Sequence, residues 1–162
     1  MKKGCEMKIT KVCFSWDCLE EHILNSYGSV MNGIKEKSST KLISDSIETL
    51  YADMMDGVVE NEKGFDVLIG KERHEIKSTT KLKTNGHFRI NGLSHKEGNC
   101  DYISVVDVIH NRLFVVPSKT FFKEGLFYIS KNNFEFCWSG TYNETDLNNI
   151  PNTSLLLKYE FI

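Results

Sequence analysis

The sequence lacks a long apolar run, an excess of positive charge and a CxxC pair. No stretch is apolar for long enough to span a bilayer, and charged residues follow the N-terminal lysines before any apolar run, so we expect neither a membrane span nor a signal peptide. The formal net charge is −2, so a nucleic-acid-binding surface would have to be a local patch. The five cysteines are odd in number, which favours reduced thiols. We therefore expect a cytoplasmic protein.

A zinc site near the N-terminus is the one metal alternative that the cysteines suggest. Cys13, Cys18 and His22 lie close together in the sequence. Their spacing matches no standard ligand pattern, and a fourth ligand is missing. We therefore do not expect zinc here.

The length and ordinary composition favour one compact domain over residues 1–162. Residues 7–15 alternate as a short strand does, residues 17–24 follow a helical pattern that ends at Gly28, and residues 32–41 are polar and favour a loop. With the elements described below, this pattern predicts an α/β fold, a mixed central β-sheet flanked by helices.

Residues 65–79 predict a β-hairpin that carries the most informative side chains of the chain. The alternation of Phe65 to Ile69 breaks at Gly70 and resumes at His74. Glu75 and Lys77 would point to one face with Ile76 buried behind them, and hairpin pairing would bring Asp66 near that face. The simplest alternative is a surface hairpin with a solvated Glu75–Lys77 pair that contributes little.

Two carboxylates and an amine at the end of a strand indicate a particular chemistry. Adjacent carboxylates repel each other, and a hard divalent cation such as Mg²⁺ relieves that repulsion. Such an ion activates water and neutralises charge on a phosphoryl group, while an ammonium orients the nucleophile. The pattern therefore suggests hydrolysis of a phosphodiester.

The hairpin resembles the motif of the PD-(D/E)xK nuclease superfamily, because Asp66 is followed after eight residues by Glu75-Ile76-Lys77. That superfamily includes type II restriction enzymes, Holliday-junction resolvases and some homing endonucleases. Phe65 stands where the proline of that motif would be. The resemblance covers residues 42–122 and implies a restriction-endonuclease-like catalytic core there, with 1–41 and 126–162 as elaborations. It also implies Asp66 and Glu75 as metal ligands and Lys77 as the catalytic lysine.

Residues 42–56 predict a helix that ends at Gly57 and packs on the sheet through an apolar stripe. Glu48 falls at the edge of this stripe, whereas Asp53 and Asp56 point away. In the resembled superfamily an acidic residue from such a helix often completes the metal site, and Glu48 is the candidate. Alternatively, Asp45 and Glu48 form a capping box at the start of the helix.

Residues 58–63 predict a short strand or turn, in which Glu60 is a weaker candidate ligand. The segment from Lys71 to Lys96 is rich in cations and polar residues and carries a short strand over 87–91. Because it follows the candidate catalytic strand, we expect it to contact DNA phosphates and base edges. The expected DNA-binding residues are Lys81, Lys83, His87, Arg89, Asn91, Ser94, His95 and Lys96. A solvated loop is the alternative.

The apolar runs 101–109 and 112–117 predict a second hairpin whose first strand lies centrally in the sheet, followed by a short helix over 118–124. Asp107 and His110 are expected to be structural or peripheral. Residues 126–162 contain further strand-like runs, and their aromatic residues predict a buried sheet face or an interface.

These inferences predict a Mg²⁺-dependent DNA endonuclease, with Mn²⁺ as a substitute metal and double-stranded DNA as the partner. A sequence-specific type II restriction enzyme is preferred, because the polar segment after Lys77 leaves room for base readout. A Holliday-junction resolvase or homing endonuclease is the alternative, and a non-catalytic nucleic-acid-binding module is a further one. A single site per chain favours a homodimer. The sequence does not determine whether a cognate methyltransferase exists.

Overall fold

The computed structural model describes residues 12–27, 40–62, 64–79, 88–90, 98–123, 128–130, 133–136 and 158–161. Its helices are α1 (Trp16–Tyr27), α3 (Thr40–Met55) and α4 (Ser118–Lys123). Its strands are β1 (Val58–Glu62), β2 (Phe65–Ile69), β3 (Glu72–Thr79), β4 (Phe88–Ile90), β5 (Tyr102–Asp107), β6 (Arg112–Pro117), β7 (Tyr128–Ser130) and β8 (Asn133–Phe136). None of the helices in these ranges is both long and apolar enough to cross a membrane.

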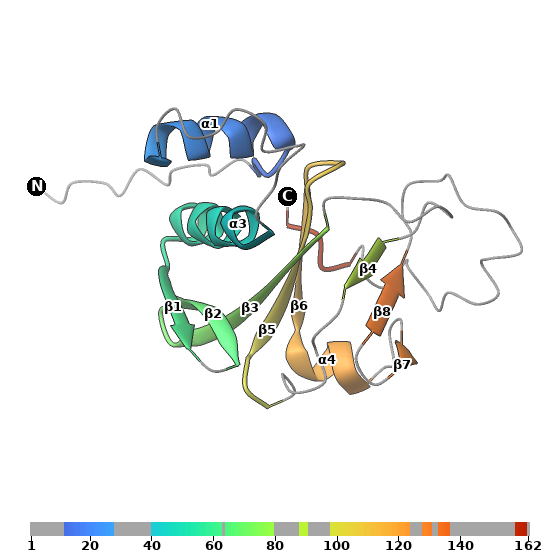
Figure 1. Cartoon of the computed structure of the whole chain (residues 1–162). Coiled ribbons are helices and arrows are strands. Elements are labelled where there is room, and N and C mark those ends of the chain that lie inside the picture. Colours follow the sequence, from blue (N-terminus) through green and yellow to red (C-terminus); the bar gives the residue numbers. More distant parts are fainter. Residues whose placement is uncertain are drawn as a thin grey trace, which may run out of the picture.

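The central sheet has five strands in the order β1-β2-β3-β5-β6 (Figure 1). β3 and β5 run parallel, whereas the other three neighbouring pairs are antiparallel. The expected α/β class, a mixed sheet flanked by helices, is confirmed, as are both hairpins and the interior position of β5. The sheet thus holds β3, the strand with the candidate catalytic residues, between two neighbours.

The two faces of β3 have different surroundings. His74 bonds to Tyr51 of α3, and Ile76 belongs to the same apolar cluster as Tyr51, so both side chains face the helix. Because neighbouring residues of a strand point to opposite faces, Glu75 and Lys77 face away from α3. Ile76 is buried behind them, as the sequence predicts.

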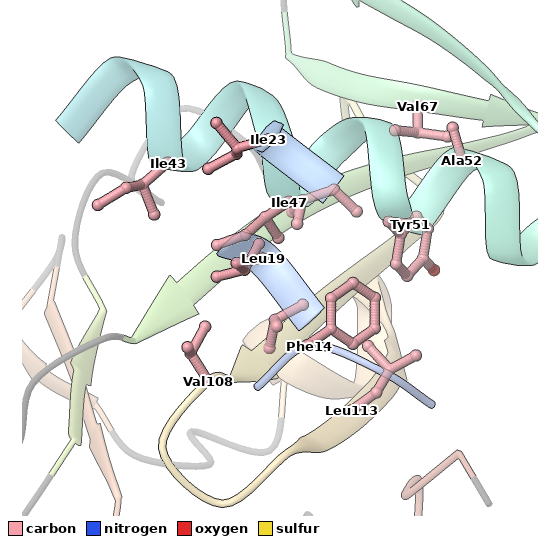
Figure 2. Close-up of a cluster of buried hydrophobic side chains, with 12 residues drawn as sticks. Phe14, Leu19, Ile23, Ile43, Ile47, Tyr51, Ala52, Val67, Val108 and Leu113 are labelled. Carbon is pink, nitrogen blue, oxygen red and sulfur yellow. The ribbon is translucent and has the colours of Figure 1, made fainter. Parts of the chain in front are cut away.

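The main apolar core lies between α1, α3 and the sheet. In Figure 2, Leu19 and Ile23 of α1 gather beside Ile47 and Tyr51 of α3, with Val67 of β2 nearby. These side chains leave almost no surface to water, and each aliphatic one contributes roughly 1.5–3 kcal/mol by its burial. This packing fixes α3 against the sheet.

The end of α3 is set by a close approach of β2. Asp56 adopts a left-handed conformation (φ 54°), and the amide of Gly57 bonds to the carbonyl of Ala52 at 2.8 Å. This six-to-one bond is that of a Schellman motif. A Cβ on Gly57 would lie 2.8 Å from the carbonyl oxygen of Leu68, so only glycine fits there. The predicted stop at Gly57 is therefore confirmed.

A second, three-stranded sheet has the order β4-β8-β7. It joins β4, which lies within the predicted strand over 87–91, to the strand-like runs of the C-terminal part, and in Figure 1 it lies to the side of the central sheet. Farther along the chain, Glu160 forms a single bridge with Phe114 of β6.

Two predictions for the N-terminal part are wrong. Residues 12–15 are not a strand, although residues 7–11 lie outside the described ranges. Cys13 and Cys18 form a disulfide, so they are neither reduced thiols nor zinc ligands. Cys13 and Cys18 can bond because the chain turns into α1 between them. Cys100 is buried, is not part of a disulfide, and lies with its thiol 3.7 Å from Oγ of Ser118.

Candidate active site

The pairing between β2 and β3 ends at the candidate site. Their last registered pair is Val67 with His74. Beyond it, the carboxylate of Asp66 accepts a hydrogen bond from the backbone amide of Ile76 through Oδ2, at 2.8 Å. The side chain of Asp66 thus replaces a backbone partner where the ladder stops, and it lies beside the peptide that follows Glu75.

Asp66, Glu75 and Lys77 share one face of the sheet. Val67 is buried in the core on the α3 side, so its neighbour Asp66 points to the other face, where Glu75 and Lys77 also lie. The ammonium nitrogen Nζ of Lys77 is 3.2 Å from Oε1 of Glu75. The structure therefore places together the acids and the amine that the sequence singled out.

The Glu75 side chain is only 3% exposed, whereas that of Lys77 is 23% exposed. An isolated carboxylate at such a depth would be costly, and the ammonium offsets part of that cost. Lys77 therefore stabilises the buried acid and still reaches solvent. An ammonium with three donor hydrogens can bond to a carboxylate and to a second acceptor at once.

Glu48 approaches the same region from α3. Burial raises the pKa of Glu48 to about 7, with further contributions from the nearby charges of Asp66, Asp45 and Glu75, in that order, while Lys41 opposes the shift. Its Oε2 atom is buried and has no hydrogen-bond partner within the described part of the chain. The predicted half-buried, inward placement of Glu48 is confirmed.

The capping-box alternative for Glu48 is wrong. α3 begins at Thr40, so Asp45 and Glu48 stand in the second and third turns instead of at the N-terminus. Asp45 instead pairs with Lys41 at 2.8 Å. Asp53 and Asp56 are exposed, and so is Glu60 on β1.

Carboxylate oxygens are the donors that Mg²⁺ prefers, and the chemistry of Asp66, Glu75 and Glu48 fits such an ion. The buried Oε2 atom of Glu48 is the kind of group that a cation would satisfy. Within the described residues, however, no three His, Cys, Asp or Glu side chains converge into a ready-made metal cluster.

A buried polar network supports β3 from the other face, and the sequence reasoning missed it. The hydroxyl of Tyr51 bonds to Nδ1 of His74 at 2.8 Å and to Oγ of Ser104 at 2.7 Å. His74 also stacks on Tyr102, and burial lowers the pKa of His74. Alternation along β3 was a signal for part of this network, because alternation puts His74 on the same buried face as Ile76.

The predicted DNA-contacting residues are not assigned by the structure. Lys81, Lys83, His87, Asn91, Ser94, His95 and Lys96 lie outside the described residues. Arg89 lies on β4, where its backbone pairs with that of Glu135. These contacts stay a prediction.

Comparison with solved structures finds several similar chains, among them the following two. One is the structure of a bacterial homing endonuclease, I-Ssp6803I, with 15% identity, a TM-score of 0.48, and coverage of 75% of this chain and 86% of that chain. The other is MepB, with 15% identity, a TM-score of 0.43, and coverage of 65% of this chain and 84% of that chain. No protein-family model matches the chain, and no curated protein matches it.

Proposed function

We propose that this protein is a Mg²⁺-dependent DNA endonuclease of the PD-(D/E)xK type. The observation that carries the proposal is the gathering of Asp66, Glu75 and Lys77 on one face of the sheet, at the point where β2 leaves β3. Glu48 supports it, because the pKa of its carboxyl responds to both acids of the hairpin.

Asp66 and Glu75 would hold the metal, and Glu48 would complete its shell or position water. When bound, the ion would supply an activated water and neutralise charge on the phosphoryl group. Beyond burial, the charges of Asp66, Asp45 and Glu75 raise the pKa of Glu48, and a bound cation would relieve that repulsion.

Lys77 would position the attacking water. Its ammonium is held by Glu75 at 3.2 Å and is partly exposed, so it can also donate to a water oxygen or a phosphate oxygen. In the reaction, that water oxygen would form a bond to phosphorus and lose a proton to solvent, while the bond from phosphorus to the leaving oxygen breaks and that oxygen takes up a proton from solvent. The burial of Glu75 keeps the donor in a defined orientation.

Duplex DNA is the proposed substrate, with the cationic segment that follows β3 as its contact surface. One chain holds one such site, so cleavage of both strands calls for a homodimer or for two binding events. We prefer a sequence-specific restriction enzyme of type II, with a resolvase or a homing endonuclease as the alternative.

The test is incubation of the purified protein with plasmid and phage DNA in Mg²⁺, Mn²⁺ or EDTA, beside the variant Lys77→Ala. Cleavage in either metal that is lost in EDTA and in the variant supports the proposal. Discrete fragments indicate a restriction or homing enzyme, whereas preferential cutting of a four-way junction indicates a resolvase. Wild-type protein that binds DNA but never nicks it would instead favour a non-catalytic binding module.

A further inference from the structure

A hydrogen-bonded pair of an acid and a histidine lies at the tip of the β5–β6 hairpin. The side chain of Asp107 is fully buried and accepts two hydrogen bonds from His110, one from the backbone nitrogen at 3.0 Å and one from ring Nδ1 at 2.8 Å. A carboxylate can only accept, so Nδ1 carries the hydrogen and Nε2 is the ring atom that faces away from Asp107. The imidazole itself is 36% exposed.

This pair lies on the same face of the sheet as the candidate active site. Lys77 is registered with Val105, and Thr79 with Asp107, so the side chains of Lys77 and Asp107 point the same way. Asp107 stands two residues beyond the level of Lys77, which corresponds to about 7 Å along the strand. The amide of Val108 bonds to the carbonyl of Thr79 at 3.1 Å, which places the hairpin tip beside the end of β3.

The tip is held firmly by the segment that precedes α1. Asn111, with a φ of 53°, accepts a hydrogen bond from the amide of Phe14 at 2.6 Å and donates one to the carbonyl of Val12 at 3.2 Å. Arg112, the next residue, is engaged by Glu160 through two bonds of 2.7 and 2.8 Å. The ring of His110 is thus exposed on an anchored turn, where Nε2 donates to an anionic acceptor when the ring carries hydrogens on both nitrogens.

We propose that His110, oriented by Asp107, contacts a backbone phosphate of the nucleic-acid strand that runs past Lys77 and the end of β3. The inference rests on the proposed endonuclease function and adds a substrate contact to it. His110 would position the strand and would not touch the reacting atoms, because Asp107 stands two residues beyond the level of Lys77.

A purely structural role for the pair predicts something else. Asp107 would then serve only to cap the turn through the backbone amide of His110. The variant His110→Ala retains that amide and removes only the ring, so the cap survives. This variant therefore separates the turn from the proposed contact.

The experiment measures binding of a fluorescent 30-base-pair duplex (about three helical turns) by anisotropy in EDTA, where cleavage does not interfere. His110→Ala is expected to weaken binding about three- to ten-fold, the range of a single hydrogen bond. His110→Gln, which keeps a donor, should restore part of it. His22→Ala on α1 is the matched control and should bind like wild type.

In Mg²⁺, the KM of His110→Ala should rise while kcat stays unchanged.

Equal affinity of His110→Ala and wild type would overturn the proposal while leaving the endonuclease function intact, if both cleave DNA. A lower melting temperature with unchanged affinity would assign the pair to the turn alone, and a fall in kcat without a rise in KM would overturn the binding role. Wild-type protein that neither binds the duplex in EDTA nor cleaves DNA in Mg²⁺ or Mn²⁺ would remove the endonuclease function and this inference together.

Discussion

The carboxylate of Asp66 accepts a hydrogen bond from the amide of Ile76 at 2.8 Å, one residue from Glu75. This bond gives Asp66 two separable roles, as a backbone acceptor and as a source of negative charge. The amide of an asparagine preserves the first role and removes the second, whereas alanine removes both.

Asp66→Asn is therefore expected to fold with nearly wild-type stability and to lose cleavage. Asp66→Ala should also lose cleavage but should unfold about 1 kcal/mol more easily, because the amide of Ile76 loses its partner. Urea unfolding in EDTA, with plasmid nicking in Mg²⁺, separates the two variants. Cleavage by Asp66→Asn at the wild-type rate would rule out Asp66 as a metal ligand.

Lys77 and Glu75 should be energetically coupled. Lys77→Met leaves the buried Glu75 carboxylate without its ammonium and is expected to destabilise the protein by about 1–3 kcal/mol. The double variant Lys77→Met/Glu75→Gln should be more stable than the sum of the single variants predicts.

The coupling is measured as a double-mutant cycle from the free energies of unfolding in EDTA. Additive effects would mean that the 3.2 Å contact contributes nothing measurable. Neither single variant should cleave DNA, so the cycle isolates stability from catalysis.

Much of the fold and of the candidate site was predictable, because the relevant signals are local. Alternation along the sequence determines which residues of β3 share a face, and it is enough to place Glu75 with Lys77. Helical periodicity likewise puts Glu48 at the edge of the apolar stripe of α3. Such periodic signals depend only on the geometry of one element.

What the sequence could not show depends on pairing between distant segments. The bonds of Tyr51 to His74 and Ser104 join three elements, so alternation along β3 could put His74 on the buried face but could not identify its partners. The Cys13–Cys18 disulfide was missed because the odd number of cysteines and the lack of a CxxC pair were taken to favour reduced thiols, and neither signal reports which side chains meet.

The Tyr51 network gives a third prediction. Tyr51→Phe preserves the ring but leaves Nδ1 of His74 and Oγ of Ser104 without the hydroxyl that joins them, in a site closed to water. We expect a loss of about 1–3 kcal/mol in the free energy of unfolding, measured in urea. Val115→Ala, in the neighbouring strand but outside the network, serves as a packing control. An unchanged stability of Tyr51→Phe would show that the network is not stabilising.

Glu48 gives a prediction for the dependence of stability on pH. Its pKa is raised from 4.5 to about 7 in the folded protein, chiefly by burial and next by Asp66. Between these values the folded state holds a proton that the unfolded state has released, so stability falls as pH rises through this window. Below pH 4.5 the carboxyl is protonated in both states and imposes no penalty.

Glu48→Gln, which mimics the protonated carboxyl, should therefore stabilise the metal-free protein at about pH 8 and have little effect at about pH 4.5. The full shift corresponds to roughly 3 kcal/mol. Because Glu48 is only partly buried, screening reduces the expected gain to about 1–2 kcal/mol, or roughly 2–8 °C in melting temperature. Thermal unfolding of both proteins in EDTA across this pH range provides the measurement. A difference that does not change with pH would show that Glu48 ionises as an ordinary exposed glutamate does, and would remove the electrostatic link between α3 and the β2–β3 hairpin.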